Sequence, residues 1–190
     1  DDSEDYAFLK HFVETVAAAG CTTFIVHARK AWLKGLSPKE NREIPPLTYE
    51  HVYRLKQELP QLTIIINGGI KTLAECRQHL QQVDGVMLGR EAYENPWLLA
   101  QVDSELFDST PLLMTRDAAL RRMQPYVEAA LAGGSSLASI SRHLLGLYRG
   151  QPAGRAFRRV ISEGAYRKGA DWGVIEKALC EVTSERAVAA

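Results

Sequence analysis

Three places in the sequence combine residues that could hold a phosphorylated ligand. Each ends a short, β-rich run: His27 ends FIVH, Asn67-Gly68-Gly69 ends LTIIINGG, and Gly89-Arg90 ends GVMLGR. Paired glycines let backbone N–H groups approach a phosphate closely, and the N-terminus of a following helix adds a favourable field. Arg90 can supply a full positive charge to the same group. Together, the three places predict a phosphorylated cofactor.

The segments around these residues alternate between helix and strand patterns in the order αβαβαβα. Expected helices cover residues 5–19, 48–59, 72–82 and 96–107, and expected strands cover 21–28, 62–69 and 85–90. This rhythm predicts an α/β fold with a parallel sheet covered by helices, in which the run FIV is buried on both faces. The carboxyl ends of parallel strands meet at one edge, so the three places should converge. Three βα units are too few to close a barrel.

The ends of the expected helices carry recognisable signals. Thr48 should cap the second helix, and Pro96 should lie in the first turn of the fourth. The first helix should place five apolar side chains on one face, namely Phe8, Leu9, Phe12, Val13 and Val16.

The strand signal stops at about Ser109, and helices joined by glycine-rich turns follow. Ser135 or Ser136 should cap a helix that carries Leu137, Ile140, Leu144 and Tyr148, and a second helix should follow GQPAG. We therefore expect two domains, residues 1–108 and 109–190.

Composition excludes several classes of protein. The 190 residues are 46% hydrophobic and 24% charged, which is typical of a globular chain. The 23 basic residues balance 23 acidic ones, so any basic surface must be local. Cys21, Cys76 and Cys180 show no metal-ligand spacing and predict reduced thiols, with no disulfide and no metal. An acidic start and the lack of a long apolar run predict a cytoplasmic protein that does not contact a membrane.

Basic residues are concentrated in the loop after the first strand. Arg29, Lys30, Lys34, Lys39 and Arg42 face only Glu40 and Glu43 within this loop, and Pro45 and Pro46 should stiffen its return. A cationic loop beside a cofactor suits a polyanionic substrate. The alternative is a charged loop that is merely solvated.

A second basic region runs from Arg142 to Lys168, where seven basic residues face a single acidic one, Glu163. If GRAFRRVIS is helical, Arg155, Arg158 and Arg159 share a face while Phe157 and Ile161 pack inward. The alternative is an exposed helix with ordinary arginines.

Long stretches of the sequence closely resemble the flavin-dependent tRNA-dihydrouridine synthases. The segments that carry this resemblance are VHARKAWLKGLSPKENREIPPL, INGGI and VDGVMLGREAYENPWLLA, and it continues more loosely into the helical region. The resemblance implies that the chain forms the last three βα units of a (β/α)8 TIM barrel, followed by a small helical domain that binds tRNA.

The same resemblance implies the chemistry. FMN reduces a uridine of the tRNA D-loop, at positions 20 and 20a, with NADPH as the electron source. FMN would be held by His27 and, around its phosphate end, by Asn67, Gly68, Gly69, Gly89 and Arg90. Lys39 and Arg42 match positions that orient the substrate, and Arg155 and Arg158 match positions that contact tRNA.

Part of the family's machinery is absent from the sequence. The Asn-x-Gly-Cys-Pro segment, whose cysteine protonates C5 of the uracil, does not occur, and the family's FMN-contacting lysine would lie just before residue 1. Cys21 opens its strand at the end opposite the site, so we interpret it as a buried structural thiol. We therefore expect no catalytic residue in this chain, and an inactive fragment.

The expected strand edges at residues 21–28 and 85–90 would be unpaired, so self-association is also expected. Two alternatives remain open: a catalytically silent tRNA-binding module, and a phosphate-binding TIM-barrel fragment of another family.

Overall fold

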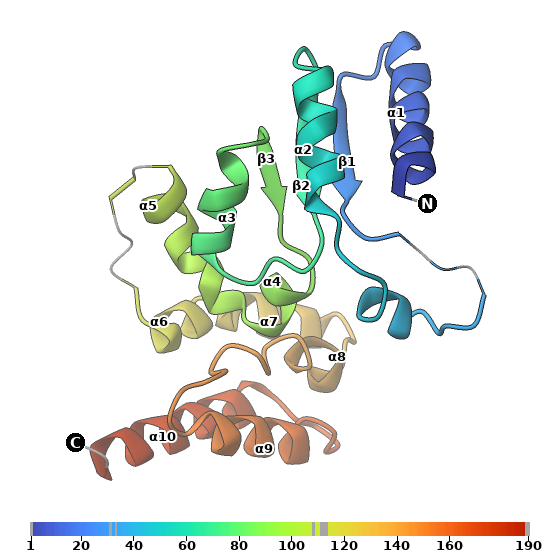
Figure 1. Cartoon of the computed structure of the whole chain (residues 1–190). Coiled ribbons are helices and arrows are strands. Elements are labelled where there is room, and N and C mark those ends of the chain that lie inside the picture. The colour runs from blue at the N-terminus through green and yellow to red at the C-terminus, as the bar shows by residue number, and fades with distance from the viewer. Residues whose placement is uncertain (1, 31, 33, 108, 111–113, 189–190) are drawn as a thin grey trace. The chain divides into compact units, whose positions relative to one another are not determined.

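The computed structural model describes residues 2–30, 32, 34–107, 109–110 and 114–188. It divides into two compact units, Asp1–Gly89 (unit 1) and Arg90–Ala190 (unit 2), which run from blue to green and from green to red in Figure 1. Within the described residues, no helix is both long and apolar enough to cross a membrane.

Unit 1 is a three-stranded parallel sheet with helices between its strands, as the sequence pattern predicts. The order along the chain is α1 (Asp2–Ala18), β1 (Thr23–His27), the short 3-10 helix η1 (Glu40–Arg42), α2 (Tyr49–Glu58), β2 (Thr63–Asn67), α3 (Leu73–Leu80) and β3 (Gly85–Met87). The strands lie in the order β1-β2-β3, and both pairs are parallel. Thr48 precedes α2 as predicted, although its side chain forms no capping hydrogen bond there.

The two faces of the sheet differ in burial. Phe24 and Val26 of β1 are buried, and Ile64 and Ile66 of β2 are completely inaccessible to solvent. Between them on the opposite face, Ile25 is 57% exposed and Met87 of β3 is 41% exposed. The expectation that FIV is buried on both faces is therefore wrong, because within the described chain only one face of the sheet is covered.

The first helix is also only partly covered. Tyr6 and Val13 of α1 are buried, whereas Phe8 is 75% exposed and Phe12 is 55% exposed. The predicted single apolar face, which included both phenylalanines, is thus not fully packed in this unit. Apolar surface is exposed both on the sheet and on the helix before it.

Unit 2 contains helices only, among its described residues. These are α4 (Arg90–Glu94), η2 (Pro96–Gln101, a 3-10 helix), α5 (Val102–Leu106), α6 (Arg116–Arg121), α7 (Gln124–Ala132), α8 (Leu137–Ser141), α9 (Gly154–Gly164) and α10 (Trp172–Val188). The predicted helix at 96–107 is thus split, with Pro96 in the first turn of its 3-10 part. Ser136 caps α8 by accepting a hydrogen bond from the Ser139 backbone N–H. That helix ends at Ser141, before Leu144 and Tyr148.

A closed apolar core fills unit 2. Its central side chains, Tyr148, Phe157 and Leu179, are completely buried, and the rings of Tyr148 and Phe157 lie 4.6 Å apart between centroids. The hydroxyl of Tyr148 donates to an oxygen of Asp117 at 2.6 Å, so burial of this tyrosine leaves its polar atom satisfied.

The segment 90–107 packs against the helices that follow it. A side chain at Gly146 would approach the carbonyl oxygen of Glu94 to 2.4 Å, and the guanidinium of Arg116 lies 4.6 Å from the ring centroid of Trp97. The compact units therefore divide at Gly89 and Arg90, earlier than the predicted domains. The division into a barrel part, 1–108, and a tRNA-binding part, 109–190, concerns function and stays a prediction.

The three cysteines are free thiols with different surroundings. Cys76 is buried, and this burial raises the pKa of its thiol. Cys21 is half-buried rather than buried as expected, because it lies just before β1 at the amino end of the sheet.

Candidate functional site: the carboxyl edge of the sheet and two basic segments

His27 and Asn67 lie side by side at the carboxyl edge of the sheet. The parallel register pairs His27 with Asn67 and Asn67 with Met87, so the three residues form one row across β1, β2 and β3. Because side chains alternate along a strand, this row shares the open face with Ile25. The structure thus brings together two of the predicted cofactor residues and adds Met87, which sequence reasoning missed.

The glycine pair after β2 makes a turn that other residues would strain. Gly68 and Gly69 have φ values of +125° and +71°. A Cβ on Gly68 would lie 3.0 Å from Leu47 Cδ2 and 3.3 Å from His27 Cε1, and one on Gly69 would lie 2.6 Å from Leu47 Cδ1. Both glycines are therefore required by conformation and by space. The turn lies directly beside His27.

Two half-buried tyrosines and the buried His79 support this turn. The Tyr49 hydroxyl donates to the Gly68 carbonyl oxygen at 2.7 Å, and the Tyr49 ring meets His79 edge-on with centroids 4.5 Å apart. Tyr53 joins the cluster through a 2.7 Å hydrogen bond between its hydroxyl and His79 Nδ1. Burial raises the pKa of Tyr49, which keeps its hydroxyl protonated as a donor. These residues carry no sequence motif, because their role arises from tertiary contact.

His27 is fixed in one orientation by the chain that follows it. The backbone N–H of Arg29 donates to Nδ1 of His27 at 3.1 Å. Nδ1 is therefore the acceptor of the ring, and in the neutral imidazole Nε2 carries the proton. The exposed ring can thus offer an N–H donor to a ligand over the carboxyl edge.

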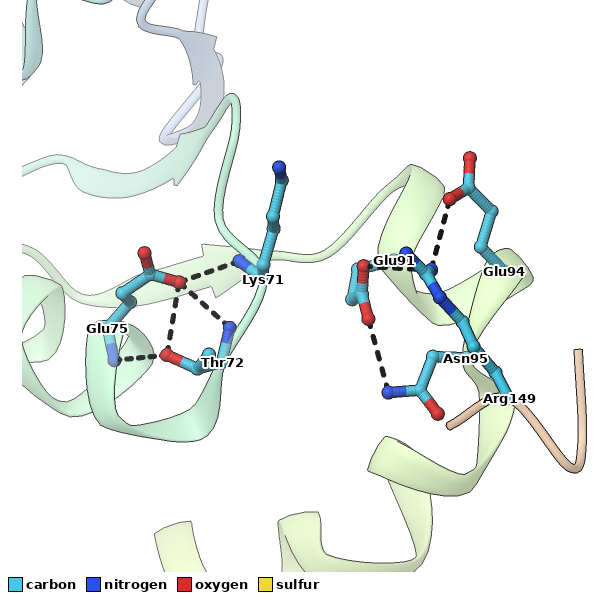
Figure 2. A network of polar contacts seen from close by, with 7 residues as sticks. All are labelled: Lys71, Thr72, Glu75, Glu91, Glu94, Asn95 and Arg149. Atoms are coloured by element: carbon cyan, nitrogen blue, oxygen red, sulfur yellow. Dashed lines mark hydrogen bonds and ion pairs between the residues drawn. The ribbon is translucent and has the colours of Figure 1, made fainter. Parts of the chain in front are cut away.

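The N-terminus of α3 differs from what the sequence predicts. Thr72 and Glu75 form a capping box, drawn in Figure 2: Thr72 Oγ1 accepts from the Glu75 backbone N–H, and Glu75 Oε2 accepts from Thr72 N–H at 2.8 Å. The same carboxylate oxygen accepts from Lys71 N–H at 2.8 Å. The hydrogen bond from Lys71 N–H is the main reason that the pKa of Glu75 is lowered, so the helix start carries a negative charge. This charge offsets the field that the helix would offer to a phosphate.

Gly89 and Arg90 lie at the junction of the two units. A Cβ on Gly89 would meet no atom within 4 Å, so its backbone is open to close approach. Arg90 is exposed and is the first residue of α4 in unit 2. Its position beside the glycine turn of unit 1 stays a prediction.

The basic loop after β1 is ordered by its own hydrogen bonds. Arg29 and Leu47 form an antiparallel bridge at its base, and Arg29 Nη1 donates to the carbonyl oxygens of Glu43, at 2.8 Å, and of Pro45. Farther out, Asn41 exchanges two hydrogen bonds with the backbone of Trp32, at 2.7 and 2.8 Å. The loop therefore has a fixed base and a stabilised middle.

Not all five cations of this loop face outward for binding. Arg29 holds the loop together, and Lys30 forms an ion pair with Asp5 of α1. Lys34, Lys39 and Arg42 are exposed. Arg29 is thus half-buried and structural, Lys30 is exposed but paired with Asp5, and the other three exposed cations include both predicted substrate-orienting residues.

The second basic region divides in a similar way. Arg149 forms ion pairs with Glu91 at 3.4 Å and with Glu94 at 3.1 Å, as Figure 2 shows, so its charge is compensated within unit 2. On α9, Phe157 and Ile161 are buried as predicted, Arg155 and Arg159 are exposed, and Arg158 is half-buried. Arg142, Arg167 and Lys168 are exposed as well, so the accessible charge extends to both sides of α9.

The site combines a glycine turn at the carboxyl edge of a parallel sheet with exposed cations nearby in the chain. These features are those of a candidate phosphate-binding α/β protein. A family model described as dihydrouridine synthase (Dus) matches residues 1–187. The chain belongs to the dihydrouridine synthase family, which consists of oxidoreductases that act on tRNA. This membership sets aside the alternative of another phosphate-binding barrel family.

Curated relatives are similar over nearly the whole chain. A tRNA-dihydrouridine(20/20a) synthase of Shewanella oneidensis is 54% identical over 185 residues, which are 97% of this chain and 55% of the relative. Proteins of the same name from Salmonella typhimurium and Escherichia coli K12 are each 54% identical over 187 residues, which are 98% of this chain and 56% and 54% of those relatives. The chain spans about half the length of these relatives.

Proposed function

We propose that the chain is the carboxyl-terminal part of a flavin-dependent enzyme that reduces uridine to 5,6-dihydrouridine at positions 20 and 20a of the tRNA D-loop. The names of its relatives support this substrate. The observation that carries the proposal is the row of His27 and Asn67 beside the Gly68-Gly69 turn, at the edge where parallel sheets bind ligands.

The open face of the sheet supports the barrel interpretation. Parallel strands are normally covered on both faces, yet Ile25 and Met87 are exposed on one of them. In a closed barrel this face points into the packed interior. The three strands are accordingly the last three of a (β/α)8 TIM barrel, and Phe8 and Phe12 of α1 lie where a preceding element would pack.

FMN is the cofactor of this proposal, and the residues present fit its phosphate end. At Gly68, Gly69 and Gly89 no side chain keeps the phosphate away from the backbone. Asn67 lies next to the glycine turn. Arg90, the residue after Gly89 in the chain, supplies a positive charge to the phosphate. His27 offers Nε2–H to the cofactor. When bound, the flavin supplies hydride chemistry, with NADPH as the electron source.

The tRNA is held by two basic segments. Lys39 and Arg42 on the ordered loop and Arg155 and Arg158 on α9 contact its backbone. Phosphate contacts give affinity and register, whereas base selection belongs to the pocket. The chain itself supplies no catalytic residue, so we expect it to be inactive alone, cytoplasmic, and prone to self-association through its open edges.

A titration of FMN fluorescence with the 190-residue chain tests the cofactor assignment. Quenching at micromolar protein that weakens in Arg90→Ala, but not in the control Arg122→Ala, supports a preformed phosphate end. Equal quenching by both variants would contradict the role of Arg90. Formation of dihydrouridine from NADPH and unmodified tRNA by this chain alone would contradict the expected inactivity.

A second candidate function is tRNA binding without flavin. The exposed cations of α9 favour it, because they lie in unit 2, whose core is closed without any missing part. Salt-dependent tRNA binding that FMN does not change is the expected result for this candidate. Binding that requires FMN would contradict it.

A further inference from the structure

Tyr166 is the most exposed large hydrophobic side chain among the described residues, at 78%. It lies in the turn between α9 and α10, followed directly by Arg167 and Lys168, which are also exposed. A single exposed ring is ordinary on a protein surface, and what distinguishes this one is the pair of exposed cations that follows it.

The turn holds Tyr166 outward in a defined way. The Ala165 N–H donates to the Ile161 carbonyl at 2.9 Å and the Arg167 N–H to that of Gly164 at 3.2 Å, so helical hydrogen bonding continues past the end of α9. Ala165 is buried, which directs the next side chain away from the core. Gly169, with φ of +75°, then reverses the chain toward α10.

This turn continues the basic face of α9. Tyr166 follows Arg159 by seven residues, about two helical turns, so the two side chains lie on one side of the helix. Arg155 and Arg159 are exposed on this face, and Glu163 is the one acidic residue between Arg155 and Lys168. Within the described part of the chain, no ion pair involves Arg155, Arg159, Arg167 or Lys168.

Other exposed apolar side chains have a different setting. Phe8 and Phe12 of α1 and Ile25 of β1 belong to unit 1, whose sheet is covered on one face only among the described residues. Tyr126 of α7, 62% exposed, belongs to unit 2 like Tyr166 and has Arg122 four residues before it, but the residues that follow it directly are Val127 and Glu128 rather than two cations. Of these residues, only Tyr166 lies in the unit with the closed core and is followed directly by two exposed cations.

We propose that Tyr166 stacks on an unpaired base of the tRNA while Arg167 and Lys168 contact the adjoining phosphates. Proteins recognise single-stranded RNA by stacking its bases on aromatic side chains within a cationic surface. This inference rests on the proposed tRNA substrate and adds to it a base contact outside the predicted residues Arg155 and Arg158.

The test measures the affinity of the 190-residue chain for unmodified tRNA at several salt concentrations. Removing the ring in Tyr166→Ala should weaken binding about five- to 150-fold, while the salt slope stays unchanged. Tyr166→Trp, which keeps a stacking surface, should bind like the wild type, and its added indole fluorescence should be quenched by tRNA. Tyr126→Ala should have no effect.

Arg167→Ala provides the complementary result. It should lower the salt slope by about one unit, because one phosphate contact is lost. Unchanged affinity in Tyr166→Ala, with the wild type binding tRNA, would overturn the stacking role and leave the proposed function standing. A wild-type chain that binds no tRNA would overturn both.

Discussion

The two units of the chain differ in how completely they bury their apolar side chains. Unit 2 encloses Tyr148, Phe157 and Leu179 in a core that is closed on all sides within its described residues. Unit 1 covers one face of its sheet and leaves Ile25 and Met87 of the other face in solvent. The difference teaches that the helical unit buries its apolar side chains by itself, whereas the unit that carries His27 and Asn67 leaves one face of its sheet uncovered among the described residues.

The closed core of unit 2 should be the most sensitive part of the molecule. Phe157→Ala leaves a cavity among completely buried side chains and should lower the free energy of unfolding by about 3–5 kcal/mol. The exposed ring at Phe8 provides the contrast, because Phe8→Ala should change this free energy by less than about 0.5 kcal/mol. Urea unfolding followed by hydrogen exchange of α9 and α10 for Phe157→Ala, and of α1 and α2 for Phe8→Ala, measures the two effects. Equal effects would remove the distinction between the units.

The glycine turn of unit 1 should tolerate no side chain. In Gly69→Ala the alanine would have to adopt a φ of +71°, and its Cβ would lie 2.6 Å from Leu47. The substitution should therefore destabilise the turn by about 1–3 kcal/mol and weaken FMN quenching. Gly134→Ala is the matched control, since Gly134 has φ of +91° but no atom within 4 Å of the added Cβ. If both substitutions have the same effect on quenching, close packing by Leu47 is not what restricts the site.

The open sheet face should govern association between copies. Ile25→Lys places a charge on this face, so the oligomer fraction should fall in size-exclusion chromatography with light scattering, with a stability change within about 0.5 kcal/mol. Ile44→Lys, in the basic loop where Ile44 is 53% exposed, should leave the association unchanged. A wild-type chain that elutes as a monomer would contradict the prediction.

The smallest effect concerns acid stability of unit 1. Hydrogen bonds from Lys10 of α1 and Arg54 of α2 lower the pKa of Glu58 to about 2. Because this pKa lies below the ordinary value of 4.5, the contact stabilises unit 1 above about pH 4.5 and is lost as the pH falls toward 2. Glu58→Gln should flatten this part of the pH dependence of the urea midpoint, while Glu50→Gln should not. An unchanged pH dependence of the urea midpoint in Glu58→Gln would contradict this role of Glu58.

Local signals in the sequence predicted much of the fold and part of the site. The βα alternation, the serine cap at Ser136 and the inward side of α9 depend on neighbouring residues, and each is confirmed, whereas Thr48 forms no capping hydrogen bond before α2. The spacing of Thr72 and Glu75 is a local capping-box signal that sequence reasoning missed, whereas nothing local shows that Arg149 is paired with glutamates far away in sequence. The role of Tyr49 under the glycine turn was missed for the same reason.

The two ends of the basic loop are joined to each other at its base, which bears on how its sequence can change in this family. Arg29 and Leu47 join the two ends of the loop, so the sheet does not depend on what lies between them. Doubling the length of such a loop adds only about 0.6 kcal/mol of closure entropy. Insertions between Lys34 and Arg42, beyond the bridge and the Lys30–Asp5 ion pair, should therefore be tolerated without rebuilding the sheet.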